Sequence, residues 1–136
     1  FMAELEASGR HVMVVFVPEH GAALTGDRMQ MAGLREIPTT DITHIPVAVR
    51  LLGRASVAPH ETLHISTPSS YLALSELISR VISRDIFAQS QIDWQALTLD
   101  LPETQAISEN SGTVMMAYQG ATYLRLGHRD WVKYAP

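Results

Sequence analysis

The sequence lacks cysteine altogether, and its other scarcities also narrow what the chain can do. Without cysteine, these residues form no disulfide, no thiolate zinc site and no cysteine nucleophile. Lysine and arginine number 10 against 14 aspartates and glutamates, for a net charge of −4. The positive residues are scattered, whereas a nucleic-acid surface needs a clustered basic stripe, so nucleic acid is not an expected partner. No apolar run approaches the roughly 18–20 residues of a membrane span.

What the sequence does contain is typical of one globular domain. Its 136 residues are 46% hydrophobic and 18% charged, which is enough apolar material for a real core. The chain begins at Phe1 rather than at a methionine, and residues 1–8 already have the pattern of the last turns of a helix, closed by Gly9. We therefore expect a piece of a longer protein.

Two apolar runs in the first half predict strands. Residues 11–17 are almost continuously apolar and β-branched, which is typical of a central strand covered on both faces, as in parallel sheets, until Pro18 ends it. Residues 45–52 form the second run, closed by Gly53. Residues 21–44 lack clear periodicity and predict a long loop with at most a short helical turn. A loop of that length inside a compact domain is usually functional.

The next segment predicts helices. After a polar connection at residues 54–61, residues 62–66 have the pattern of a short strand. Thr67-Pro68 then supplies a helix start, with the hydroxyl as N-cap and proline at the first helical position. Apolar residues recur at helical spacing from there to about Arg84, and a shorter helix is predicted around residues 93–99.

Beyond Pro102 the character of the sequence changes. Residues 103–112 are polar, and the stretches TVMMAYQ, ATYLRLG and DWVKY that follow predict a small antiparallel meander. Strand, long loop, strand and helix followed by a β appendage indicate an α/β domain with a C-terminal subdomain.

The tip of the first strand carries two candidate metal ligands. Glu19 and His20 follow Pro18 directly, and the side chains of consecutive residues converge only where the backbone has stopped being extended. Open α/β sheets place ligand sites at the carboxyl ends of strands. A carboxylate and a neutral imidazole together suit zinc, or manganese. The small residues that follow, Gly21 to Ala23, allow a substrate or a second loop to come close.

Spacing alone leaves the rest of such a site open. An acid and a histidine in a loop are most often just solvated, and zinc needs further partners. The remaining histidines show no recognisable ligand spacing; they are His11, His44, His60, His64 and His128. His44, directly before the second strand, is the strongest candidate among them. His60 and His64 have the character of ordinary loop residues, and His128 lies in a predicted turn of the meander.

Arg35 is the candidate for a phosphoryl contact. A guanidinium held in a loop near a metal offers two parallel donors to a phosphoryl oxygen. The alternative interpretation is a surface arginine, and Asp27 and Arg28 in the same loop are expected to be solvated charges.

Several stretches, taken in order, resemble one family. They are PEHGAAL, GDRMQMAGLREIP, ITHIPV, TPSSYLALSELISRV, LPETQAISEN and YQGATYLRLGHRDWVKY. The sequence resembles the cellulose-operon phosphoethanolamine transferases of enteric bacteria, over the C-terminal end of their periplasmic catalytic domain. This family belongs to the alkaline phosphatase-like superfamily of metal-dependent phosphoryl and sulfuryl transferases.

The resemblance implies a fold and an active site. The fold is the C-terminal portion of an alkaline phosphatase-like α/β/α sandwich, with residues 1–102 in the transferase domain and residues 103–136 as its small β appendage. Glu19 and His20 are implied as two zinc ligands, and Arg35 as a catalytic residue near the phosphate. Lipid A-modifying relatives carry a histidine after this loop, where Arg35 is the expected substitute.

The resemblance also implies what lies elsewhere. The serine nucleophile, a cysteine zinc ligand and the membrane-spanning helices are expected upstream, in an inner-membrane protein of which this part is periplasmic. Phosphoethanolamine is expected to pass from phosphatidylethanolamine to glucose hydroxyls of cellulose, with other cellulose synthase subunits as partners.

A second interpretation makes the chain a polysaccharide-binding or scaffolding module. The contact residues would then be the aromatic side chains of the meander, since aromatic rings stack on sugar faces; they are Tyr118, Tyr123, Trp131 and Tyr134. The competing assignment places these four rings in the core and rim of the small sheet.

Overall fold

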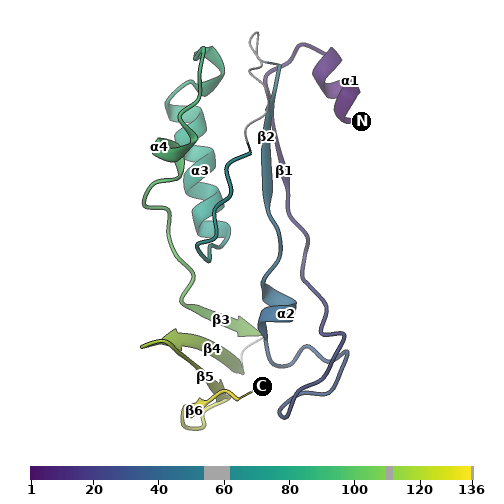
Figure 1. Ribbon diagram of the computed structural model, residues 1–136, viewed down its shortest axis with the longest axis vertical. Helices are drawn as coiled ribbons and strands as arrows, with labels where there is room; N and C mark the ends of the chain where they lie inside the picture. The colour runs from purple at the N-terminus through teal and green to yellow at the C-terminus, as the bar shows by residue number, and fades with distance from the viewer. Residues whose placement is uncertain (54–61, 110–111, 136) are drawn as a thin grey trace. The chain divides into compact units, whose positions relative to one another are not determined.

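The computed structural model describes residues 1–53, 62–109 and 112–135, with its elements labelled in Figure 1. The helices are α1 (Met2–Ala7), α2 (Thr40–Thr43), α3 (Tyr71–Ser83), the 3-10 turn η1 (Ile86–Ala88) and α4 (Trp94–Thr98). The strands are β1 (Val12–Phe16), β2 (Ala48–Leu52), β3 (Ala106–Glu109), β4 (Thr113–Tyr118), β5 (Ala121–Leu126) and β6 (Val132–Lys133). Helices with antiparallel sheets, one of them C-terminal, confirm the predicted α/β class. The predicted connection at residues 54–61 lies outside the described residues.

The chain divides into two compact units. The first contains Phe1–Phe16 and Val47–Glu103, and the second contains Val17–Pro46 and Thr104–Pro136. The long loop after β1 therefore belongs to the same unit as the C-terminal sheet. The assignment of residues 1–102 to a transferase domain with residues 103–136 as its appendage stays a prediction.

In the first unit, β1 and β2 run side by side as an antiparallel pair (Figure 1), with Val15 opposite Val49. The expectation of a central strand in a parallel sheet is wrong, because within the described residues β1 pairs with β2 alone, and the two run in opposite directions. A parallel pair needs a crossover connection, usually a helix of several turns, and the only helix between β1 and β2 is the four-residue α2. A continuous apolar run identifies a strand without specifying the direction of its partner.

The predicted helices of this unit are confirmed, with one correction at a start. α3 covers Tyr71–Ser83, and its N-cap is Ser70, whose hydroxyl accepts from the Leu72 N–H at 3.2 Å. The predicted start at Thr67-Pro68 is therefore wrong by one turn. Residues 62–66 form no strand, since they are exposed throughout and pair with no neighbouring strand in the described part of the chain. α4 confirms the second helix, with the carboxylate of Asp93 accepting from the Ala96 N–H.

The core of the first unit lies between these helices and one face of the β1–β2 pair. Leu77 and Val81 are one helical turn apart on α3 and are buried with Ile86 and Leu97. Residues at alternate positions of the two strands pack against this cluster; they are Met13, Val49 and Leu51. One apolar face of the strand pair thus meets one apolar stripe of the helix.

The helices outside this core are short. α1 confirms the predicted N-terminal helix, and Gly9 adopts a φ of 64°, the left-handed conformation expected of its cap. Across residues 1–53, 62–109 and 112–135, no helix combines the length and apolar character required to cross a bilayer.

In the second unit, the C-terminal sheet has the strand order β3-β4-β5-β6, with each neighbouring pair antiparallel (Figure 1). This confirms the meander and adds β3, which sequence analysis missed inside the polar stretch 103–112. Met115 and Leu124 face each other across β4 and β5 and are buried together with Ile37 from the long loop. The sheet therefore anchors that loop through a shared core.

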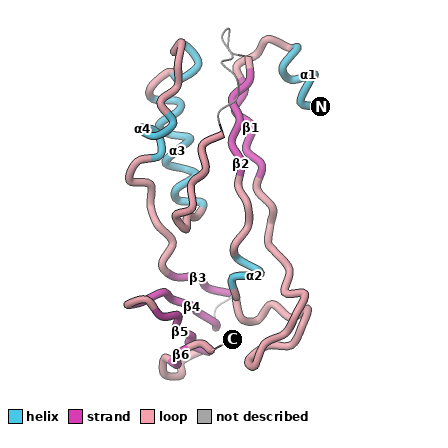
Figure 2. Tube along the Cα trace, viewed as in Figure 1, coloured by secondary structure: helices cyan, strands magenta, loops and turns pink. Residues whose placement is uncertain are grey.

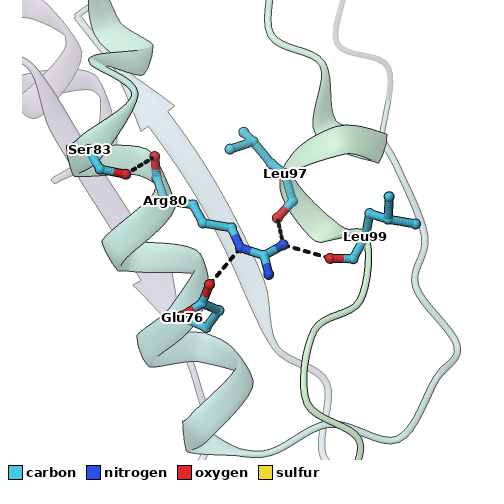
Figure 3. Close-up of polar contacts among 5 residues, drawn as sticks. All are labelled: Glu76, Arg80, Ser83, Leu97 and Leu99. Atoms are coloured by element: carbon cyan, nitrogen blue, oxygen red, sulfur yellow. Dashed lines mark hydrogen bonds and ion pairs between the residues drawn. The ribbon is translucent and has the colours of Figure 1, made fainter.

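An arginine links the two main helices of the first unit, as Figure 3 shows. Arg80 on α3 donates from Nε to Glu76 Oε1 at 2.8 Å, and from Nη1 to the carbonyls of Leu97 and Leu99 at 3.0 and 2.6 Å. Those carbonyls lie at the end of α4, where the last turn of a helix leaves its acceptors without intrahelical partners. Arg80, on α3, thus provides a hydrogen-bond donor for the free carbonyls at the C-terminal end of α4.

Substitutions of Arg80 are expected to separate two contributions to stability: the positive charge, and the several donors that the guanidinium holds in one plane. Arg80→Ala should lower the free energy of unfolding by about 2 kcal/mol, because several bonds to a charged donor are lost. Arg80→Lys should recover less than half of this, since one ammonium cannot reach both helices. Thermal unfolding of the full-length protein measures the effect, with the exposed Arg84→Ala as control. Equal losses in the Arg80 and Arg84 variants would contradict the assignment.

Candidate functional site

The predicted site residues lie on the long loop Val17–Pro46, most of which has no regular structure (Figure 2). Glu19 and His20 come directly after Pro18, beyond the carboxyl end of β1, and both are exposed. Arg35 is also exposed and lies fifteen residues further along the loop. The position after a strand is the one predicted, although the strand is antiparallel.

The structure brings His20 and Arg35 into direct contact. Arg35 Nη1 donates to His20 Nε2 at 2.6 Å, and the other ring nitrogen of His20, Nδ1, lies 2.6 Å from the Gly21 carbonyl oxygen. A carbonyl can only accept, so Nδ1 carries the proton and Nε2 the lone pair. This is the tautomer in which a histidine binds a metal through Nε2.

A buried side-chain amide holds the segment that carries Arg35. Gln30 is 7% exposed, and its Oε1 accepts from the Ile37 N–H at 2.6 Å while its Nε2 donates to the Ile37 carbonyl at 3.1 Å. The amide thus pairs with the backbone as a neighbouring strand would. Leaving either backbone group buried without a partner would cost roughly 1–3 kcal/mol. Sequence analysis missed Gln30, and no local pattern distinguishes it from a solvated glutamine.

The small residues after His20 allow a second segment to approach, as predicted. The Gly21 N–H donates to the Ile42 carbonyl at 2.7 Å. A Cβ at Gly21 would overlap the Asp41 carbonyl oxygen, and because that oxygen belongs to the backbone, the overlap could be relieved only by moving the chain. Glycine is therefore required here to keep the start of the loop against α2.

Asp27 is not the solvated loop charge that was expected. Its Oδ1 accepts from the Met29 and Gln30 N–H groups at 2.6 and 2.8 Å, and its Oδ2 accepts from the Tyr134 hydroxyl. The bond from Tyr134 and the two backbone bonds lower the pKa of Asp27. Burial, with the bond to Asp27 and the charges of Asp27 and Asp41, raises the pKa of Tyr134 to about 12. An aspartate that bonds backbone two residues on is a recognisable turn signal that sequence analysis left unused.

Glu19 and His20 are the two candidate metal donors that sequence analysis placed on this loop. Among residues 1–53, 62–109 and 112–135, no three histidine, aspartate or glutamate side chains are grouped so as to hold a metal ion. The tautomer of His20 fits a zinc ligand, and Glu19 adds a neighbouring carboxylate, so the two fit as part of a donor set. A hollow of about 540 Å³ in the same unit is lined by Asp27, Asp41 and Tyr134, but by neither Glu19 nor His20. The roles of Glu19, His20 and Arg35 stay predictions.

The other histidines are dispersed. His44 is exposed and its N–H closes α2 on the Thr40 carbonyl, while the ring of His11 stacks on Phe87 with centroids 4.9 Å apart. His64 is exposed, and His128 is exposed within the turn between β5 and β6. His60 lies outside the described residues.

Three of the four candidate aromatic residues share the outer face of the C-terminal sheet. Leu124 points to the core, so its neighbours Tyr123 and Arg125 point away from it. The Tyr118 and Tyr123 rings meet edge to face at 6.4 Å, and the Arg125 guanidinium lies 5.1 Å from the Trp131 ring centroid. Tyr134 is the exception, because it packs against the core beside Ile37 and bonds Asp27.

Comparison with known proteins gives one family. Residues 1–131 match the family described as the cellulose biosynthesis protein BcsG C-terminal domain. The chain is 51% identical to the cellulose biosynthesis protein BcsG of Salmonella typhimurium (strain LT2) in an alignment of 136 positions that covers 98% of this chain and 24% of the relative. It is 52% identical to the protein of the same name from Escherichia coli (strain K12), with the same coverage. The chain thus spans about a quarter of the length of these relatives.

The bond between Tyr134 and Asp27 predicts a pH-dependent stability. The lowered pKa of Asp27 contributes stability above its ordinary value of 3.8 that is lost as the pH falls through the lower folded value. The raised pKa of Tyr134 contributes stability below its ordinary value of 10.0 that is lost as the pH rises through about 12. Tyr134→Phe should therefore lower the Tm at neutral pH, and the difference from wild type should shrink towards both extremes.

Thermal unfolding of the full-length protein across this pH range is the measurement. Tyr71→Phe serves as control, because Tyr71 is an exposed tyrosine of α3. A difference between Tyr134→Phe and wild type that stays constant from acid to alkaline pH would show that the hydroxyl does not bond a titrating partner.

Proposed function

We propose that this chain, which belongs to the cellulose biosynthesis protein BcsG C-terminal domain family, supplies part of the active site of a zinc-dependent phosphoethanolamine transferase acting in cellulose biosynthesis. Glu19 and His20 are two of the zinc ligands, and Arg35 binds the phosphoryl group. The donor is phosphatidylethanolamine, the acceptor is a glucose hydroxyl of cellulose, and this part of the protein is periplasmic. Other components of the cellulose machinery are its partners.

The proposed chemistry is a double displacement. A serine elsewhere in the protein attacks the phosphorus and releases the diacylglycerol oxygen, and a glucose hydroxyl then takes the phosphoethanolamine from that serine. Zinc, when bound, favours the serine alkoxide and polarises the phosphoryl oxygen. Arg35 binds the equatorial phosphoryl oxygens, whose negative charge redistributes as the bonds to phosphorus change.

The contact between Arg35 and His20 is the observation that supports this proposal best. It places a guanidinium, the preferred donor for phosphoryl oxygens, within 2.6 Å of a histidine in the metal-binding tautomer. One lone pair cannot serve both partners, so an ion held by His20 would take the place of the Arg35 bond at Nε2. The guanidinium of Arg35 would then be free to bind phosphoryl oxygens.

Substitutions in the full-length protein separate the two roles. Arg35→Ala should cost ~3–4 kcal/mol of transition-state stabilisation, or a loss of about 10²–10³-fold in turnover, with zinc content unchanged at saturating zinc. Arg35→Lys should restore only part, since it keeps the charge and loses the fork. Glu19→Ala and His20→Ala should lower zinc content and activity together.

Zinc per protein and turnover of a soluble phosphoethanolamine donor are measured for each variant. The exposed Arg129→Ala, in the turn between β5 and β6, is the matched control and should behave as wild type. If Arg35→Ala turns over normally, or loses zinc as the ligand variants do, the role of Arg35 is wrong. A wild-type protein without transfer activity would contradict the whole proposal.

A second candidate function rests on the outer face of the C-terminal sheet. Tyr118 is 55% exposed and Trp131 39% exposed, and both share this face with Tyr123 and Arg125. Rings beside a guanidinium suit a polysaccharide, because apolar sugar faces stack on the rings while the sugar hydroxyls accept from the guanidinium. On this interpretation the chain binds the glucan without acting on it.

Alanine substitutions on this face test the second function. Tyr123→Ala and Trp131→Ala should each weaken binding of the full-length protein to cello-oligosaccharides about threefold to tenfold, as expected for one lost ring contact. Tyr71→Ala removes a ring that is more exposed than either of these, from α3 in the other unit, and should leave binding unchanged. Titration calorimetry measures the affinity. Equal weakening by all three variants, or no binding by wild type, would exclude this candidate.

A further inference from the structure

Gln30 is an anomaly within its loop. Its neighbours Met29 and Met31 are exposed, at 38% and 72%, whereas Gln30 is 7% exposed. A loop that buries a polar side chain between two exposed methionines has reversed the usual hydrophobic preference. Such a reversal has to be offset by the bonds that the polar group makes.

The bonds of Gln30 close a short segment around Arg35. Its amide pairs with both backbone polar groups of Ile37, so residues 30 and 37 are fixed to each other. Between them, the Gly33 N–H donates to the Ala23 carbonyl at 2.8 Å. Ile37 is in turn buried against Met115 and Leu124 of the C-terminal sheet. Arg35 therefore projects from a segment whose two ends and middle are all tied to other parts of the unit.

We propose that Gln30 is a positioning residue for Arg35, and that its amide keeps the guanidinium within reach of His20. The role of Arg35 in phosphoryl binding rests on the proposed function, but the position of its guanidinium does not. Gln30 acts through the backbone of residues 30–37, because its amide bonds the N–H and carbonyl of Ile37 rather than His20 or Arg35. Without its amide, both ends of the segment separate and Arg35 samples positions away from His20.

The reactivity of His20 towards diethyl pyrocarbonate reports this position without any need for activity. His20 is exposed, yet Nε2 is engaged by Arg35 and Nδ1 by the Gly21 carbonyl. In the full-length protein freed of metal by a chelator, His20 should therefore react more slowly than the exposed His64. Mass spectrometry of proteolytic peptides gives the rate at each histidine.

Gln30→Met is the main variant, because it preserves the length of the side chain and removes both bonds. The rate at His20 should rise several-fold, to the level of Arg35→Ala, while the rate at His64 stays constant. Gln30→Glu keeps an acceptor and loses the donor, which places a carboxylate against the Ile37 carbonyl, and it should also release Arg35. Circular dichroism establishes whether each variant folds, and one folded variant of the two, Gln30→Met or Gln30→Glu, is enough to test the inference. Gln105→Met, at an exposed glutamine of the same unit, should leave both rates unchanged.

Combining the variants separates positioning from simple destabilisation. If Gln30 acts through Arg35, the double variant Gln30→Met with Arg35→Ala should react at His20 no faster than Arg35→Ala alone. A rate at His20 that stays at wild type in folded Gln30 variants, or that adds to the effect of Arg35→Ala, would overturn the inference.

A transfer assay on the same zinc-loaded proteins extends the test. Gln30→Met should lower turnover about a hundredfold at most, as expected for a displaced substrate-binding group, with zinc content unchanged. Unaltered turnover together with a raised rate at His20 would contradict the phosphoryl-binding role of Arg35 and support the positioning role of Gln30. A wild-type protein that transfers nothing would contradict the proposed function alone, since the reactivity of His20 still decides the role of Gln30.

Discussion

The pairing of the Gln30 amide with the backbone of Ile37 is the constraint on which the candidate site depends. A primary amide offers one acceptor and two donors on a plane, so it can replace a strand neighbour where the chain has none. The bonds at 2.6 and 3.1 Å let Ile37 bury its side chain without leaving its N–H and carbonyl unpaired. Because Ile37 is buried in the core, the segment that carries the exposed Arg35 is held in place at this end.

The C-terminal sheet and the residues that follow it anchor the loop that contains Gln30 and Ile37. Met115 and Leu124 pack on Ile37, and Tyr134 bonds Asp27, so two points of the loop are attached to residues far later in the sequence, 107 positions later for Tyr134. Asp27 and Gln30 are also joined directly, through the Gln30 N–H. The sheet therefore contributes to the site without supplying a side chain to it. The free energy that orders the loop comes largely from burial and bonding at the sheet, because the loop has one short helix and no strand.

The sequence predicted those features that local periodicity or backbone conformation determines. The apolar spacing of α3, the left-handed Gly9 and the alternation in the meander each depend on residues a few positions apart. The antiparallel direction of β1 and β2 was not predictable in this way, since it depends on how a loop of many residues returns. The start of α3 was displaced because both Thr67-Pro68 and Ser70 offer good caps, and the observed bond forms at Ser70.

The same distinction applies to the site. Glu19 and His20 could be proposed as candidate ligands from sequence because their side-chain chemistry and their place after a strand depend only on adjacent residues. The partner of His20 could not be derived from spacing, because Arg35 reaches it across fifteen positions of irregular chain. Asp27 and Gln30 look like solvated loop residues in sequence, and their roles appear only when the carboxylate meets Tyr134 and the amide meets Ile37.

The bond between Arg35 and His20 also limits how a metal site on this loop can work. Nε2 of His20 has one lone pair, and in the structure that lone pair accepts from Arg35. An ion at Nε2 therefore requires the guanidinium to move, although the segment that carries it is fixed at Gln30, Ile37 and Gly33. The motion must then occur within the long Arg35 side chain, whose several rotatable bonds allow it to swing while its Cα stays in place. A fixed backbone with a mobile guanidinium would keep Arg35 beside His20 whether or not an ion occupies Nε2, which is what the proposed phosphoryl contact of Arg35 requires.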